Sequence, residues 1–166
     1  ANTLVLTLTG VDPALSVVQG ASRTALLTLT ITNGPDAGNF SKVRGLTLAV
    51  GDLSDDLIAA WLEAAGTTRG TFSGSGPRRT AAVALTFSGT RVWEVYGALA
   101  SLAQEGVIRV TLAGLVVDAP DEVEPFASPL AGRVFIQDAP DTLSMAFTPA
   151  PSPLLLIGAA PRPMLA

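Results

Sequence analysis

Serines and carboxylates are the side chains here that could do chemistry, because the sequence contains no histidine and no cysteine. That absence excludes disulfides, thiol chemistry, zinc fingers and every catalytic triad that relies on imidazole. Ser73 and Ser75 lie in the glycine-rich stretch GTFSGSG, which differs from the nucleophile elbow, G-x-S-x-G between a strand and a helix. Their base would have to be Lys42 or a carboxylate, so we predict that the protein is not an enzyme.

Two groups of carboxylates could act as paired acids or bind a cation. The first lies at the start of a predicted helix and comprises Asp52, Asp55 and Asp56. The second is the densest in the chain and comprises Asp118, Asp121, Glu122 and Glu124. Hard cations such as Ca²⁺ prefer oxygen ligands, but the sequence contains no calcium-loop spacing. We therefore predict a capped helix start at the first group and a solvated acidic loop at the second, with no metal and no cofactor.

Two further features could bind a small molecule. Residues 74–79, GSGPRR, combine backbone freedom with two arginines, but a phosphate loop has the spacing G-x-x-x-x-G-K-[ST] and leads into a helix. Because this run leads into a predicted strand, we expect a hairpin turn with solvated arginines. Trp61 and Trp93 could stack on a sugar, but their spacing beside Leu and Val favours core positions.

Composition limits the classes of partner. Lys and Arg total 10 and Asp and Glu 14, which gives a net charge of −4 and an isoelectric point near 4.6. This charge argues against nucleic acid as a partner, because its binding needs a basic footprint, and we predict none. Only 14% of the residues are charged and 48% are hydrophobic, yet no apolar run suffices for a membrane-spanning helix, which needs about 20 residues. We therefore expect extra surface to be buried against partners. The scarcity of Asn, Gln and Cys is typical of thermophile proteins.

Alternation of apolar residues with Thr or Ala predicts that most of the chain forms strands. The pattern is clearest in residues 23–32, RTALLTLTIT, whose leucines and isoleucine fall on one side and threonines on the other. Similar patterns predict strands at residues 3–9, 16–19, 46–50, 81–87, 107–117, 133–137 and 141–148. Residues 36–43 and 118–132 are predicted as polar loops, and Asn33-Gly34-Pro35 as a turn.

Two segments at helical spacing predict short helices between strands. Ser54 would cap the first, with Leu57, Trp61 and other apolar residues in its stripe, and Gly66 would end it. Thr90 would cap the second, and Gly106 would end it.

These elements predict one all-β domain over residues 1–148, a two-sheet β-sandwich with two short helices in the connections. A jelly roll is the preferred topology and an immunoglobulin-like sandwich the next, although the paired cysteines of a true immunoglobulin domain are missing. Residues 149–166 form a Pro-rich apolar arm. Proline confines a strand to an edge, so we expect the arm to close its own sheet or to pair with another subunit. Its interface candidates are Leu154, Leu155, Leu156, Ile157, Met164 and Leu165.

In length, strand number, low charge and apolar tail, the chain resembles the small single jelly-roll capsid proteins and the tail and decoration proteins of bacteriophages. The resemblance implies a virion structural protein, made in the host cytoplasm, that forms a homo-oligomer and contacts other subunits without a cofactor. The uncharged threonine face of residues 23–32 fits this interpretation, because faces in water usually carry Lys and Glu as well.

The alternative is a β-sandwich binding module for a carbohydrate or a protein. It predicts an exposed aromatic platform, for which Phe40, Phe72 and Phe126 are the candidates. An enzyme, with an acid-lined cleft, is the third possibility. Outside a virion, we expect the protein in the cytoplasm.

Overall fold

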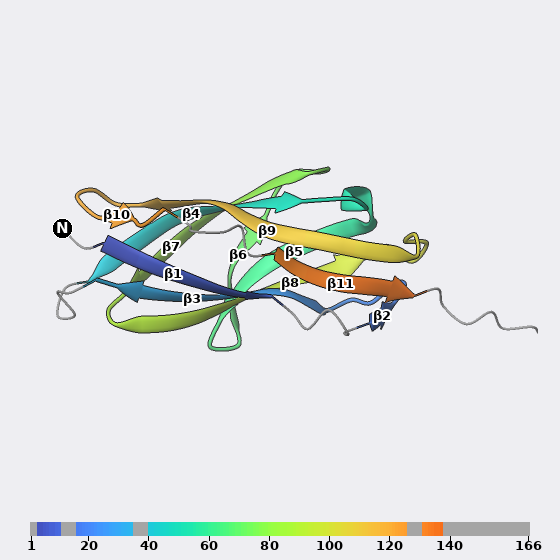
Figure 1. The fold of residues 1–166 in the computed structure, drawn as a ribbon, viewed down its shortest axis with the longest axis horizontal. Coiled ribbons are helices and arrows are strands. Elements are labelled where there is room, and N and C mark those ends of the chain that lie inside the picture. The colour runs from blue at the N-terminus through green and yellow to red at the C-terminus, as the bar shows by residue number, and fades with distance from the viewer. Residues whose placement is uncertain (1–2, 11–15, 35–39, 126–130, 138–166) are drawn as a thin grey trace, which may run out of the picture.

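The computed structural model describes residues 3–10, 16–34, 40–125 and 131–137, which form two β-sheets packed face to face. Figure 1 shows the layers, with β9 and β4 crossing above β1, β3 and β8. The alternating sequence pattern explains this architecture, because successive side chains of a strand point to opposite faces of the sheet. The predicted two-sheet β-sandwich is confirmed.

The first sheet has six strands in the order β10-β1-β3-β8-β5-β6. Their bounds are Glu122–Val123 (β10), Thr3–Gly10 (β1), Thr24–Asn33 (β3), Thr90–Leu99 (β8), Leu57–Ala64 (β5) and Thr67–Phe72 (β6). The second sheet has five strands in the order β2-β11-β9-β4-β7. Their bounds are Ser16–Val18 (β2), Ala131–Gln137 (β11), Gly106–Val117 (β9), Ser41–Val50 (β4) and Arg78–Phe87 (β7). A 3₁₀ turn, η1, spans Ser54–Asp56.

The core lies between the sheets and is made of the inward side chains of both. Leu29 and Ile31 of β3 are completely buried, as are Leu48 of β4 and Ile108 of β9. Burial of each such side chain contributes about 1.5–3 kcal/mol. The outward threonines of β3 remain partly exposed, as a half-buried strand requires.

Both predicted helices are wrong. Residues 57–64 form β5 and residues 90–99 form β8, whose Trp93, Val95 and Leu99 alternate toward the core. β8 pairs with β3 on one side and β5 on the other. Helix propensity differs by less than about 0.7 kcal/mol per ordinary residue, so these pairings outweigh it. Gly66, predicted to end a helix, instead takes a positive φ of 73° in the β5–β6 turn.

Several strand boundaries also differ from the prediction. β4 begins at Ser41, inside the predicted loop 36–43, and β6 was not predicted at all. The predicted loop 118–132 contains β10 and the first residues of β11. The strand at 141–148 and the arm at 149–166, with its six interface candidates, lie outside the described residues. Within the described ranges, no helix has the length and apolar character needed to cross a membrane.

The two sheets come into backbone contact where β11 passes β3. A Cβ atom on Gly132 would lie 1.6 Å from the carbonyl oxygen of Leu26, so only glycine fits there. This contact brings the backbone of β11 at Gly132 against β3, while the next side chain, Arg133, points outward.

Candidate functional site

Charge is distributed unevenly between the two sheets. The five strands β2, β11, β9, β4 and β7 contain no Asp and no Glu. They hold six of the ten basic residues of the chain: Lys42, Arg44, Arg78, Arg79, Arg109 and Arg133. Because the chain as a whole has 14 acidic residues, this sheet is the basic part of an acidic protein.

We call the outward surface of β7, β4, β9 and β11 the basic face. Its cations are Lys42, Arg44, Arg78, Arg109 and Arg133, all wholly or partly exposed. Small neutral side chains lie between them: Thr47, Ala49, Thr80, Ala82, Thr111 and Ala113. Apart from the cations, the larger exposed side chains on this face include Val107 and Val116 of β9.

Arg79, the sixth cation, points inward and is 3% exposed. Its Nη2 donates hydrogen bonds to the carbonyl oxygens of Ser54, at 2.9 Å, and Leu57. Burial lowers the pKa of this guanidinium. Of the arginines predicted to be solvated in GSGPRR, Arg78 is exposed but Arg79 instead ties the η1–β5 junction to β7.

The strand register arranges the basic face in rows. Arg78, Ala49 and Thr111 are neighbours across β7, β4 and β9. Two residues further along, Arg109 lies opposite Arg133. Residues two apart on a strand are separated by about 6.6 Å and neighbouring strands by about 4.8 Å, so Arg109 and Arg133 are adjacent, whereas Arg78 lies two strands away from Arg109.

Arg109 and Arg133 are directly opposed in the antiparallel pair of β9 and β11. Both side chains are exposed, and among the described residues neither forms an ion pair. Like charges in directly opposite positions destabilise a sheet. The fold thus carries an unfavourable pair of cations that no described carboxylate neutralises.

At the other end of the basic face, Arg44 is neutralised. Its Nε and Nη2 donate to Asp118 Oδ1 and Oδ2 at 2.7 and 2.9 Å. These hydrogen bonds hold the pKa of the Asp118 carboxyl below its ordinary value. Asp118, from the acidic group predicted to be solvated, is thus a bidentate partner of Arg44. Lys42, whose carbonyl accepts from the Asp118 N–H, is the sole lysine of the sequence.

A shallow groove of about 300 Å³ crosses the basic face beside Arg44. Its lining consists of Arg44, Gly45, Leu46, Thr47, Thr80, Ala81, Ala82 and Val116. A register shift between Val43 and Gly45 and the missing side chain of Gly45 leave the depression. Val116 forms an apolar wall and is 58% exposed. The near edge of the groove, at Thr47 and Thr80, lies two residues, or about 6.6 Å, from the row of Ala49 and Arg78.

On the opposite side of the molecule, the outward aromatic side chains of the six-stranded sheet contact one another and are held by Glu63 and Arg23. Trp61 and Tyr96 are cross-strand neighbours, with ring centroids 6.3 Å apart. Glu63 accepts from Trp61 Nε1 at 2.7 Å and from Arg23 Nη2 at 2.9 Å. These two hydrogen bonds, that from Trp61 first, lower the pKa of the Glu63 carboxyl. Arg23 Cζ lies 3.8 Å from the centroid of the Tyr96 ring and covers it.

The three residues predicted for an exposed aromatic platform differ in their exposure. Phe40 is 70% exposed, Phe72 is buried at 4%, and Phe126 lies outside the described residues. Trp93 is in the core, as predicted, whereas Trp61 is partly exposed on the outward side of β5. The threonine face of β3 is less neutral than its own sequence indicates, because Glu94 of β8 lies opposite Thr28.

The remaining sequence candidates have local structural roles. Ser54 caps no helix, and Asp56 Oδ2 accepts the backbone N–H of Gln104 at 3.1 Å. Ser73 Oγ donates to the carbonyl oxygen of Thr80 at 3.1 Å, which joins β6 to β7. Over the described ranges, no three His, Cys, Asp or Glu side chains gather closely enough to hold a metal ion.

No known protein family matches the chain, and no curated protein is similar to it in sequence. Its fold is similar to that of several solved structures. A type I cohesin from Clostridium thermocellum, solved in complex with a dockerin, is 10% identical, with a TM-score of 0.47 over 82% of this chain and 100% of the other. A non-cellulosomal cohesin from Archaeoglobus fulgidus is 11% identical, with a TM-score of 0.43 over 82% and 91%. The human F-spondin reeler domain is 15% identical, with a TM-score of 0.36 over 81% and 89%.

The basic face was missed because the chain was judged by its total charge. Its signal is nevertheless present in the sequence: the segments 41–50, 78–87, 106–117 and 131–137 carry Lys or Arg but no acid. What the sequence could not show is that these four segments are neighbours in one sheet.

Proposed function

We propose that this protein is a non-catalytic β-sandwich module that binds a protein partner through the basic face. The partner presents carboxylates to Arg78, Arg109 and Arg133. The observation that carries the proposal is the directly opposed pair Arg109 and Arg133, exposed and without a described counter-ion in a chain of net charge −4. A carboxylate placed between two guanidinium groups removes their repulsion and gains charge-assisted hydrogen bonds.

The groove beside Arg44 supports a protein as the ligand. Protein interfaces combine a small number of anchoring side chains in pockets with a polar rim. The groove volume of about 300 Å³ and its lining of Ala, Gly, Thr and Val suit one apolar side chain of the partner. The cations at both ends of the face would then fix the orientation of the partner.

A polyanion fits the basic face less well than a protein does. Nucleic acid affinity rests on many phosphate contacts along a backbone. Here the two cationic ends are separated by a neutral row that contains Thr47 and Thr80. The net charge of −4 also opposes long-range attraction of a polyanion.

The aromatic cluster on the other sheet gives little support to a carbohydrate ligand. Stacking on a sugar requires a free ring face, and Arg23 already covers Tyr96 at 3.8 Å. A virion subunit, the first interpretation of the sequence, finds no support in the structural comparisons. Self-association through the arm at residues 149–166 stays a prediction.

The experiment is affinity capture from an extract of the source organism with the immobilised full chain. We expect one or a few acidic proteins to be retained by the wild type and lost with Arg109→Gln/Arg133→Gln. The matched control is Thr30→Glu/Thr71→Glu, which changes the net charge by the same amount on the opposite sheet. Equal retention by the wild type and the arginine variant would refute the proposal, as would equal loss with both variants.

A further inference from the structure

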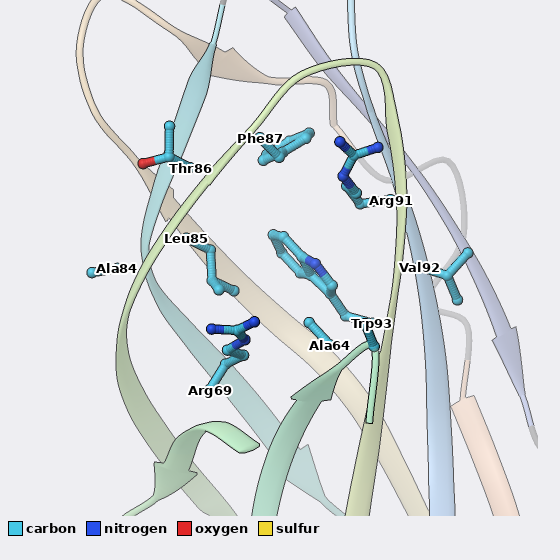
Figure 2. Close-up of a pocket in the computed structure, with 10 residues that line it drawn as sticks. Ala64, Arg69, Ala84, Leu85, Thr86, Phe87, Arg91, Val92 and Trp93 are labelled. Atoms are coloured by element: carbon cyan, nitrogen blue, oxygen red, sulfur yellow. The ribbon is translucent and has the colours of Figure 1, made fainter. Parts of the chain in front are cut away.

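A second site lies at the side of the sandwich, where the edge strands β6 and β7 separate. The two strands are bridged at Ser73 and Thr80, and they touch at Gly70, where a Cβ would lie 2.6 Å from Val83 Cγ1. Beyond Gly70 they diverge, and a cavity of about 450 Å³ opens between the β5–β6 turn, β7 and the start of β8. Figure 2 shows its lining.

Arg69 enters this cavity because of a β-bulge. Leu62 of β5 pairs with Gly70, and the next residue, Glu63, pairs with Thr68. Arg69 is therefore the extra residue of β6, without a partner across the strand. Bulges often redirect a side chain at functional sites, and here the bulge brings a guanidinium to the wall of the cavity.

Arg91 reaches the same cavity from an inward-facing position of β8. It lies opposite Ile31, which is completely buried, so the two side chains are on the same face of the sheet. Arg91 Nη1 donates to the carbonyl oxygen of Thr90 at 3.0 Å. Among the described residues, neither Arg69 nor Arg91 forms an ion pair.

The wall between the two arginines is apolar and aromatic. Trp93 is 2% exposed and packs edge-on against Phe87, with ring centroids 5.5 Å apart and an interplanar angle of 81°. Leu85 extends the apolar wall along β7. In Figure 2 the Trp93 indole lies between Arg91 on one side and Arg69 and Leu85 on the other.

From this juxtaposition we propose that the cavity binds a small organic anion with a planar apolar body, most simply an aromatic carboxylate. The carboxylate pairs with the guanidinium group at one end of this wall, for which bidentate pairing is the preferred geometry. The ring packs on the partly exposed Leu85, beside the buried indole of Trp93. The volume of about 450 Å³ is within the range of small-molecule sites. This site is separate from the basic face, so its failure would leave the proposed function untouched.

The test follows the indole N–H signal of Trp93 by NMR while benzoate is added to the full chain. Trp61→Phe assigns the signal, because the sequence has two tryptophans. We expect a saturable shift with a dissociation constant on the order of 1 mM, as suits so small a ligand. Loss of the charge-assisted hydrogen bonds should weaken binding roughly tenfold in whichever of Arg69→Gln and Arg91→Gln removes the guanidinium that holds the carboxylate.

Two control ligands test separately how much the aromatic ring and the negative charge contribute to binding. Benzyl alcohol has the ring without the anion, and inorganic sulfate has the anion without the ring, so neither should saturate the Trp93 signal in the same range. Both arginines are exposed, and we expect their variants to keep the thermal midpoint of the wild type. An absent shift with benzoate, an equal response to benzyl alcohol, or unchanged affinity in Arg69→Gln/Arg91→Gln would overturn the proposal.

Discussion

Replacing one of the two facing arginines of the basic face should stabilise the fold while it weakens binding. In Arg133→Glu, an opposite charge faces Arg109 across β9 and β11. An opposite-charge pair contributes about 0.2–1 kcal/mol, whereas the existing like-charge pair is unfavourable by a similar amount. Because both side chains are exposed and screened by salt, we expect a net gain of about 0.5–1 kcal/mol. For a chain of this size the midpoint should rise by about 1–4 °C.

The double variant Arg109→Glu/Arg133→Glu restores a like-charge pair, now of carboxylates. Its stability should return close to that of the wild type, although its affinity for an acidic partner should be the lowest of the three. The free energy of unfolding is measured in urea, at low salt and again at about 0.5 M salt, where the gain in Arg133→Glu should shrink. If Arg133→Glu is no more stable than the wild type at low salt, the arginines do not repel each other and the main support for the basic face is lost.

Three further outcomes are expected from the structure. In urea denaturation, Gly132→Ala should lose about 3 kcal/mol or more of its free energy of unfolding, because the added methyl group would lie 1.6 Å from a carbonyl oxygen. The control Gly114→Ala, whose methyl group would have its nearest atom at 3.7 Å, should be nearly neutral. Equal losses in the two variants would contradict the close approach at Gly132. Arg79→Met should lose about 1–3 kcal/mol in the same assay, because two backbone carbonyls lose their buried donor, and an unchanged midpoint would show that this donor is dispensable. The pKa of Glu63 is lowered in the folded state, so its stabilising contribution is complete above the ordinary value of 4.5 and is lost as the pH falls through the lower folded pKa. When the free energy of unfolding is measured over a pH series, the wild type should therefore approach the stability of Glu63→Gln in acid. A difference between the two proteins that stays constant with pH would contradict this.

The fold could be predicted from the sequence where apolar and small polar residues alternate without interruption. β3 illustrates this, because Leu29 and Ile31 face the core while Thr28 and Thr30 face outward, as the pattern requires. β8 shows why prediction failed elsewhere. Its Val92, Val95, Tyr96 and Leu99 fit a helical stripe as well as a strand, and only its pairing with β3 and β5 decides between them. Such pairing depends on residues far away in the sequence, so the sequence of β8 alone does not predict it.

The candidate site could be predicted only in part. The sequence shows that the segments around Lys42, Arg78, Arg109 and Arg133 lack acids, but the direct opposition of Arg109 and Arg133 depends on the register of β9 and β11. The cavity beside Trp93 was beyond prediction, because it requires a bulge at Arg69 and the divergence of two edge strands. Sequence reasoning did exclude imidazole and thiol chemistry outright, because the chain has no residue able to do it.

The central claim, that an acidic protein docks on the basic face, is tested most directly by zero-length cross-linking at Lys42. This side chain is the only lysine of the sequence and lies on that face, so a carbodiimide joins it to a carboxylate in direct contact. We expect the captured partner to yield a peptide linked through Asp or Glu to Lys42. Lys42→Arg keeps the charge and should abolish the product without releasing the partner. A partner that remains bound to Arg109→Gln/Arg133→Gln and never links to Lys42 would contradict the account.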